Sequence, residues 1–140
     1  MKYNELIQLY FERSNALQGY WTLYVVILGG LLAFSSLRKQ PAALTTFVVT
    51  LLFALFAYEN LGAIHDVTRQ RFAVLDTIKK TDAAASLEIQ PIRAALEPTL
   101  IPATVASVNA THLSADVLTI LALWAMEFRR RKYGNSAGVA

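Results

Sequence analysis

Long uncharged apolar runs alternate with short charged segments along this chain. Residues 14–37 contain no charged side chain, a basic pair follows at 38–39, and a second uncharged run covers residues 40–58. With a rise of ~1.5 Å per residue, a helix made from either run can cross a hydrocarbon core of ~30 Å. The pattern therefore predicts a transmembrane hairpin with spans over residues 19–37 and 41–59.

The helical pattern extends beyond both spans. In residues 1–18, Leu6, Tyr10 and Leu17 share one helical face while charged side chains lie elsewhere, which predicts an amphipathic segment continuous with the first span. The second span has no proline after it and keeps a helical period toward Lys80. We expect this helix to continue outside the membrane.

The rest of the chain is more broken. Residues 60–101 read as an extramembrane helical connection, with short helices expected at 83–90 and 92–96 around two prolines. A third span is predicted over 102–128, where Pro102 opens the helix, and the Gly/Ser-rich residues 133–140 are predicted to be a disordered tail.

Composition supports the membrane assignment. The chain has 140 residues, of which 55% are hydrophobic and 16% charged, and its mean hydropathy is +0.40. A soluble domain has about 45–50% apolar and about 25% charged residues. We therefore expect an all-α integral membrane protein with a single three-helix domain. The absence of cysteine excludes disulfides and thiolate chemistry.

The basic residues indicate orientation rather than nucleic-acid binding. Arg129, Arg130, Arg131 and Lys132 directly follow the third apolar segment, where a topology anchor that also attracts anionic lipid is expected. The 38–39 pair lies on the same side. The positive-inside rule then predicts a cytoplasmic C-terminus and an outside N-terminus, in what we interpret as a bacterial inner membrane.

Small residues form a stripe on each of the first two spans. Such stripes allow membrane helices to approach closely. We expect the two stripes to meet each other, or one of them to pack against a second copy. Their members are Gly29, Gly30, Ala33 and Ser36 on the first span, and Thr46, Thr50 and Ala54 on the second.

Polar residues form two further stripes. The third span carries Asn109, His112, Asp116 and Thr119 at helical spacing, and the outer end of the second carries Glu59, His65 and Asp66. Ionisable residues at membrane depth usually face a cavity or a partner. The structural alternative is that the stripes face water or pair with Arg69 or Arg71.

Three functions follow as hypotheses. The first is a membrane protein that acts through helix–helix contact, as an accessory subunit or homo-oligomer. The second is an oligomeric ion or proton channel, or a transport component, lined by the polar stripe of the third span. The third is a haem- or metal-binding subunit that uses His65 and His112. No motif indicates an enzyme. The cofactor is unknown, with none expected apart from the candidate metal ligands His65 and His112, and the expected partners are the lipid bilayer and either a second copy or another membrane protein.

Overall fold

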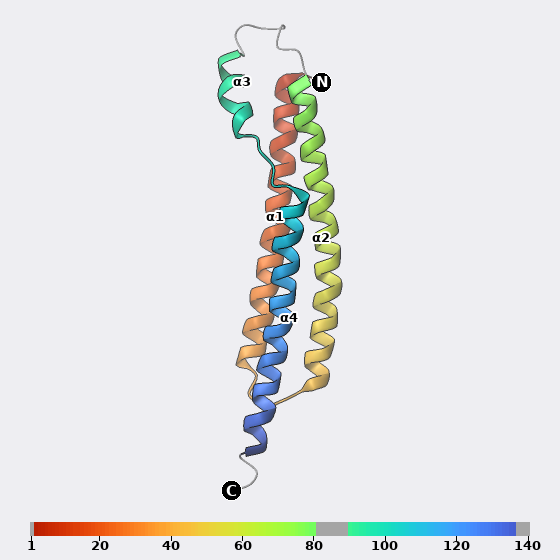
Figure 1. The fold of residues 1–140 in the computed structure, drawn as a ribbon, viewed down its shortest axis with the longest axis vertical. Coiled ribbons are helices and arrows are strands. Elements are labelled where there is room, and N and C mark those ends of the chain that lie inside the picture. Colours follow the sequence, from red (N-terminus) through yellow and green to blue (C-terminus); the bar gives the residue numbers. More distant parts are fainter. Residues whose placement is uncertain (1, 81–89, 137–140) are drawn as a thin grey trace.

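The computed structural model describes residues 2–80 and 90–136. Within these ranges every regular element is helical: α1 (Tyr3–Leu37), α2 (Ala43–Lys80), α3 (Gln90–Leu96), the short 3₁₀ turn η2 (Glu97–Thr99) and α4 (Val105–Ser136). Figure 1 shows α1, α2 and α4 lying side by side, with α3 beside the end where α1 begins. The α1–α2 connection and the end of α4 lie together at the opposite end.

The expected fold class is confirmed. Three helices, α1, α2 and α4, are long and apolar enough to span a membrane. α1 has 35 residues and α2 has 38. At 1.5 Å per residue they are about 52 and 57 Å long. Since a hydrocarbon core is only ~30 Å thick, each helix must project beyond it by roughly 20 Å or more.

Both long helices are continuous, as their periodicity predicts. The backbone N–H of Lys2 donates to the Glu5 carboxylate (2.8 Å) at the start of α1. The expected inward residues Leu6, Tyr10 and Leu17 are buried. The amphipathic segment and the first span therefore form one helix.

Several predicted boundaries need correction. α2 begins at Ala43 and α4 at Val105, each slightly later than the proline expected to open it. The Thr104 hydroxyl accepts from the Ser107 backbone N–H (3.1 Å), so a side-chain cap starts α4. The chain is helical through Ser136, so disorder from residue 133 was wrong for 133–136. Residues 83–89 and 137–140 of the predicted short helix and tail lie outside the described residues.

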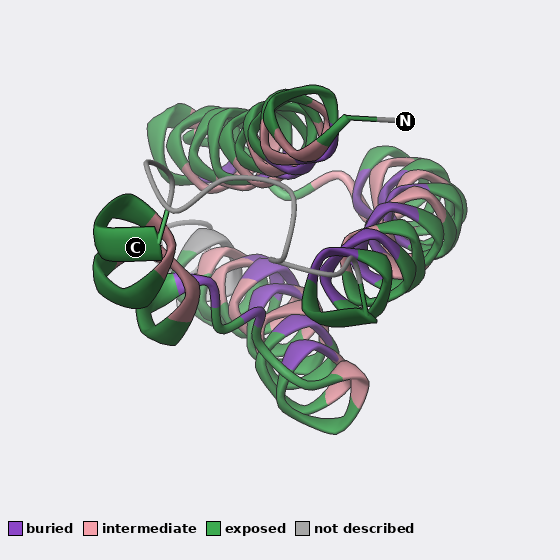
Figure 2. Cartoon of the chain, turned by 90° about the horizontal axis from the view of Figure 1, so that it is seen from above, coloured by how far each residue is buried: buried purple, intermediate pink, exposed green. Residues whose placement is uncertain are grey.

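The core is a series of apolar layers along the bundle. Figure 2 shows buried positions on the sides that the helices turn toward one another and exposed positions on the outer sides. One layer surrounds Leu6 and Ile78, a second surrounds Leu17 and Ile64, and a third surrounds Tyr24 and Phe53. Two polar clusters accompany these layers, and both involve α1, α2 and α4.

Candidate functional site

The polar stripe of α4 faces the inside of the bundle. His112 and Thr119 are buried, whereas Asn109 and Asp116 are partly buried. Glu127 lies on the same buried face, nearer the C-terminal end of α4. The helical spacing therefore identified a real face, and in the single chain this face contacts α1 and α2.

His112 is the centre of the first polar cluster, which we call the His112 centre (His112, Asp116, Asn60 and Tyr24). Its side chain is fully buried. The ring Nδ1 lies 2.9 Å from Asp116 Oδ2, and Nε2 lies 3.2 Å from Asn60 Oδ1 on α2. The Tyr24 hydroxyl of α1 donates to Asp116 Oδ1 at 2.7 Å. One histidine–aspartate pair thus connects all three long helices.

Hydrogen-bond directions constrain the protons of this centre. The Asn60 amide nitrogen donates to the Tyr20 carbonyl (3.3 Å), so Asn60 Oδ1 is the atom that faces His112. Because Oδ1 only accepts, His112 Nε2 must carry a proton. The contact between Nδ1 and Asp116 Oδ2 gives the ring its second hydrogen-bond partner, so both ring nitrogens of the buried histidine are satisfied.

Two aromatic rings enclose His112. The Tyr24 ring centroid lies 4.1 Å from that of His112, and the Trp21 centroid lies 5.7 Å from it. The sequence placed Tyr20, Trp21 and Tyr24 at the start of a span, where aromatic residues usually contact headgroups. Tyr20 is exposed, but Tyr24 is only 2% exposed. Tyr24 is therefore a core residue that sequence reasoning missed.

A second histidine–asparagine contact also joins α2 and α4, but here α2 supplies the histidine and α4 supplies the asparagine. His65 of α2 contacts Asn109 of α4 through Nε2 and Oδ1. Each of the two helices thus supplies one histidine and one asparagine to the α2–α4 interface. Glu59 and Asp66, expected to join His65, are on the exposed side of α2.

The alternative pairing of the α4 stripe with arginines is wrong. Arg71 instead donates to the Tyr10 hydroxyl at 3.0 Å, and its guanidinium lies 5.0 Å from the Tyr10 ring centroid. Arg69 is exposed. Asp116 obtains its partners from Tyr24 and His112, not from an arginine.

The histidines do not form a shared ligand set. His65 and His112 each contact a different asparagine, and no group of three or more His, Asp or Glu side chains suited to a metal occurs in residues 2–80 and 90–136. Both nitrogens of His112 are already in hydrogen bonds. A metal or haem iron bound there would have to displace Asp116 or Asn60.

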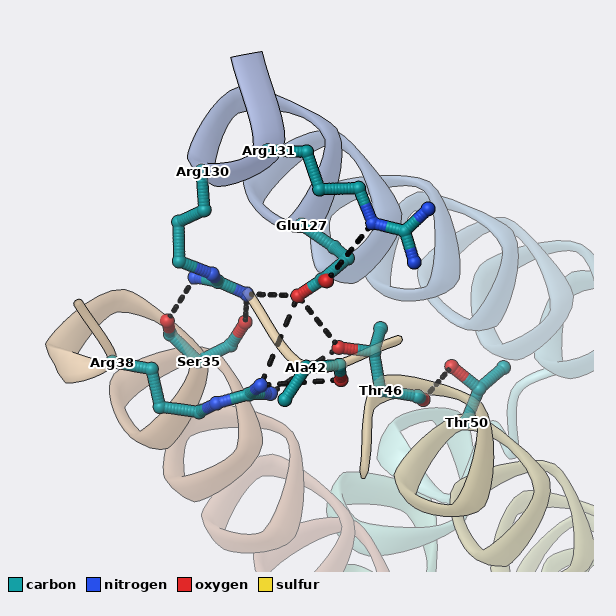
Figure 3. Close-up of polar contacts among 8 residues, drawn as sticks. All are labelled: Ser35, Arg38, Ala42, Thr46, Thr50, Glu127, Arg130 and Arg131. Atoms are coloured by element: carbon teal, nitrogen blue, oxygen red, sulfur yellow. Dashed lines mark hydrogen bonds and ion pairs between the residues drawn. The ribbon is translucent and has the colours of Figure 1, made fainter. Parts of the chain in front are cut away.

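A second polar cluster lies at the other end of the spans (Figure 3). We call it the Glu127 centre, and it consists of Glu127, Arg38, Arg130, Arg131 and Thr46. Its carboxylate is fully buried and lies 3.1 Å from Arg130 Nη2, 3.3 Å from Arg131 Nε and 3.8 Å from Arg38 Nη2. The Thr46 hydroxyl of α2 donates to Oε2 at 3.1 Å. The cluster therefore joins the ends of α1 and α4 to the start of α2.

The arginines of this centre are also fixed by backbone groups. Arg130 Nη1 donates to the Ser35 carbonyl at 2.7 Å, and Arg38 Nη2 donates to the Ala42 carbonyl at 3.2 Å (Figure 3). Glu127 was not among the candidate residues that the sequence indicated. Its spacing of three and four residues from Arg130 and Arg131 was the signal that indicates ion pairing.

The small-residue stripes of α1 and α2 do not meet within the chain, which corrects the first of the two expectations, while packing of one stripe against a second copy stays a prediction. Gly29, Gly30, Ala33 and Ser36 are all exposed, and a Cβ built on either glycine meets no neighbouring heavy atom within 4 Å. The opposite stripe is divided between an inward Thr46, an intermediate Thr50 and an exposed Ala54. The inward face of α1 consists instead of larger residues and Ser35, including Tyr24 and Leu31.

Comparisons with protein-family models, with curated proteins and with solved structures found no match to this chain. Function must therefore be inferred from the geometry described above.

Proposed function

We propose that this chain is a small integral membrane protein that acts by contact between its helices and those of other membrane chains, as an accessory subunit or a homo-oligomer. The observation that carries the proposal is the outer face of α1 around Gly29, Gly30 and Ala33. This face is exposed, and its glycines leave room for a neighbouring backbone. Glycine and alanine at such positions favour close helix association in membranes.

The burial of the three spans supports α1 as the contacting helix. The most apolar stretch of α1 is less buried by its own chain than the corresponding stretches of α2 and α4. Asp116, His112 and Glu127 of α4, in contrast, are turned inward and have partners within the chain. The polar stripe of α4 therefore needs no partner chain for its hydrogen bonds, whereas the glycine face of α1 has room for one.

Disulfide cross-linking in native membranes tests this proposal. The chain has no cysteine, so Gly30→Cys introduces a single thiol on the glycine face. Leu51→Cys on α2 and Leu121→Cys on α4 are the controls, since both residues are exposed apolar positions of spans. We expect oxidant-dependent cross-links from Gly30→Cys, to a second copy or to one other protein, and few from the controls. Equal cross-linking at all three positions, or none at any, would overturn the proposal.

One observation favours transport as a second candidate. His112 Nδ1 lies 2.9 Å from Asp116 Oδ2 on one of the spanning helices, and the Asp116 side chain is still 15% exposed. Proton relays in membranes use such groups. Proton flux into proteoliposomes should then fall when Asp116→Asn is introduced. Absence of flux in the wild type would exclude this candidate without affecting the first.

A further inference from the structure

A basic pocket opens at the end of the bundle that holds the α1–α2 connection. Its volume is about 560 Å³, and it lies between the end of α1 and the last turns of α4. Four of its lining side chains are cations, and the described residues that line it include no Asp or Glu. The cations are Arg38, Lys39, Arg129 and Arg130.

The adjoining Glu127 offsets only part of this charge. Its single carboxylate is shared among Arg38, Arg130 and Arg131, and it lies buried behind them rather than in the pocket lining. Lys39 and Arg129 have no part in these ion pairs. The pocket therefore has a positive charge that the described part of the chain does not neutralise, and the natural ligand is an anion.

Two of the cations are held in place before any ligand arrives. Arg38 donates to the Thr46 hydroxyl and the Ala42 carbonyl, both at 3.2 Å, and Arg130 donates to the Ser35 carbonyl at 2.7 Å. The Nε of Arg130 is buried and has no hydrogen-bond partner among the residues that the structure describes. Fixed guanidinium groups suit phosphate, whose oxygens match their planar donors, and little side-chain entropy is lost when they bind it.

The position of the pocket identifies the source of the phosphate. It lies where the uncharged runs end, which is where lipid headgroups are expected, and this is the end that the positive-inside rule predicts to be cytoplasmic. Basic pockets between membrane helices on that side bind phosphorylated lipid headgroups. Exposed apolar side chains lie close in sequence to the lining residues, and acyl chains could run along them: Phe34, Leu37 and Phe128.

We propose that this pocket binds the phosphoryl headgroup of an anionic phospholipid. The site differs from a diffuse topology anchor because it combines side chains of α1, the connection and α4 in one cavity. Its lining includes Ser36, the last member of the small-residue stripe of α1, but not Gly29, Gly30 or Ala33, so the proposal does not depend on oligomer formation.

Native mass spectrometry of the detergent-solubilised full chain, titrated with phosphatidylglycerol, tests the site. The informative variant is Lys39→Gln with Arg129→Gln, because neither residue contacts Glu127 and folding should persist. The matched control, Arg69→Gln with Lys79→Gln, removes one arginine and one lysine from exposed positions far from the pocket. We expect one retained lipid on the wild type, at least tenfold weaker binding in the pocket variant, and less than a twofold change in the control.

Two further arms separate specific from general attraction. Phosphatidylcholine should bind at least tenfold more weakly than phosphatidylglycerol, and millimolar inorganic phosphate should not displace the bound lipid. Equal binding of the two lipids, or equal losses in the pocket and control variants, would overturn the proposal. Displacement by inorganic phosphate would assign the pocket to a soluble anion and overturn the lipid assignment.

Discussion

The His112 centre and the Glu127 centre both join α1, α2 and α4, but they bury charge in different ways. The His112 centre sets one carboxylate, that of Asp116, against one imidazole, and its remaining contacts come from the side chains of Tyr24 and Asn60, which carry no charge. The Glu127 centre sets one carboxylate against three arginines at the end of the spans. Removal of the carboxylate should therefore lower the free energy of unfolding more at Glu127 than at Asp116, because the arginines that remain around position 127 have no opposing charge.

The largest effect should come from Glu127→Ala. Arg38, Arg130 and Arg131 would then face one another without the buried carboxylate, and loss of one partner of a buried ion pair typically costs about 3–5 kcal/mol. We expect a loss of this size in the free energy of unfolding, measured by SDS titration of the micelle-solubilised chain. Glu59→Ala, at an exposed carboxylate of α2, is the control and should change it by less than about 0.5 kcal/mol.

Asp116→Ala should have the next largest effect. It leaves His112 Nδ1 without its partner and the Tyr24 hydroxyl with only the long contact to the His112 carbonyl (3.4 Å), at a cost of about 2–3 kcal/mol in the same titration. Asp116→Asn should cost at most about 1 kcal/mol, because an amide can accept from Tyr24 and donate to a neutral His112. If Asp116→Asn is as harmful as Glu127→Ala, the His112 centre needs a charge and the contrast between the two centres fails.

Thr46→Val should have a smaller effect within the Glu127 centre. The hydroxyl of Thr46 donates to Glu127 and accepts from Arg38, whereas the charges themselves are unchanged by its removal. We expect a loss of about 1 kcal/mol in the free energy of unfolding. Its neighbour Thr45 is exposed, so Thr45→Val provides a control of the same chemistry. Equal effects of the two variants would mean that the hydroxyl of Thr46 adds nothing to the centre.

Sequence reasoning succeeded where polarity differs from its surroundings. Uncharged runs located the first two spans, a more broken apolar segment indicated the third, and the spacing of Asn109, His112 and Asp116 identified the inward face of α4. It failed for α1 because both the lipid-facing and the core-facing sides of a membrane helix are apolar. The stripe containing Gly29 and Gly30 is exposed, and the face with Tyr24 is buried. Hydrophobicity alone cannot distinguish these two faces.

Partners across helices were also beyond the sequence. Nothing local indicates that Tyr24 reaches Asp116, since the two are far apart along the chain and meet only through the packing of α1 on α4. Glu127 was different, because its arginine partners at positions 130 and 131 lie one helical turn away. The His112 centre depends on the tertiary fold and was therefore predicted only in part. The Glu127 centre depends largely on local spacing, which was visible in the sequence but was overlooked.

The oligomeric state of the full chain, extracted from its own membrane into polymer-bounded nanodiscs, tests the proposed function most directly. Native mass spectrometry of the wild type, Gly30→Leu and Gly62→Leu would measure it. A Cβ at either glycine meets no neighbouring atom within 4 Å, so both variants should keep the three-helix fold. We expect the wild type and Gly62→Leu to be found in complexes with a second copy or another protein, and Gly30→Leu to be monomeric. A monomeric wild type without any bound protein, or complexes unchanged by Gly30→Leu, would contradict a function based on the glycine face of α1.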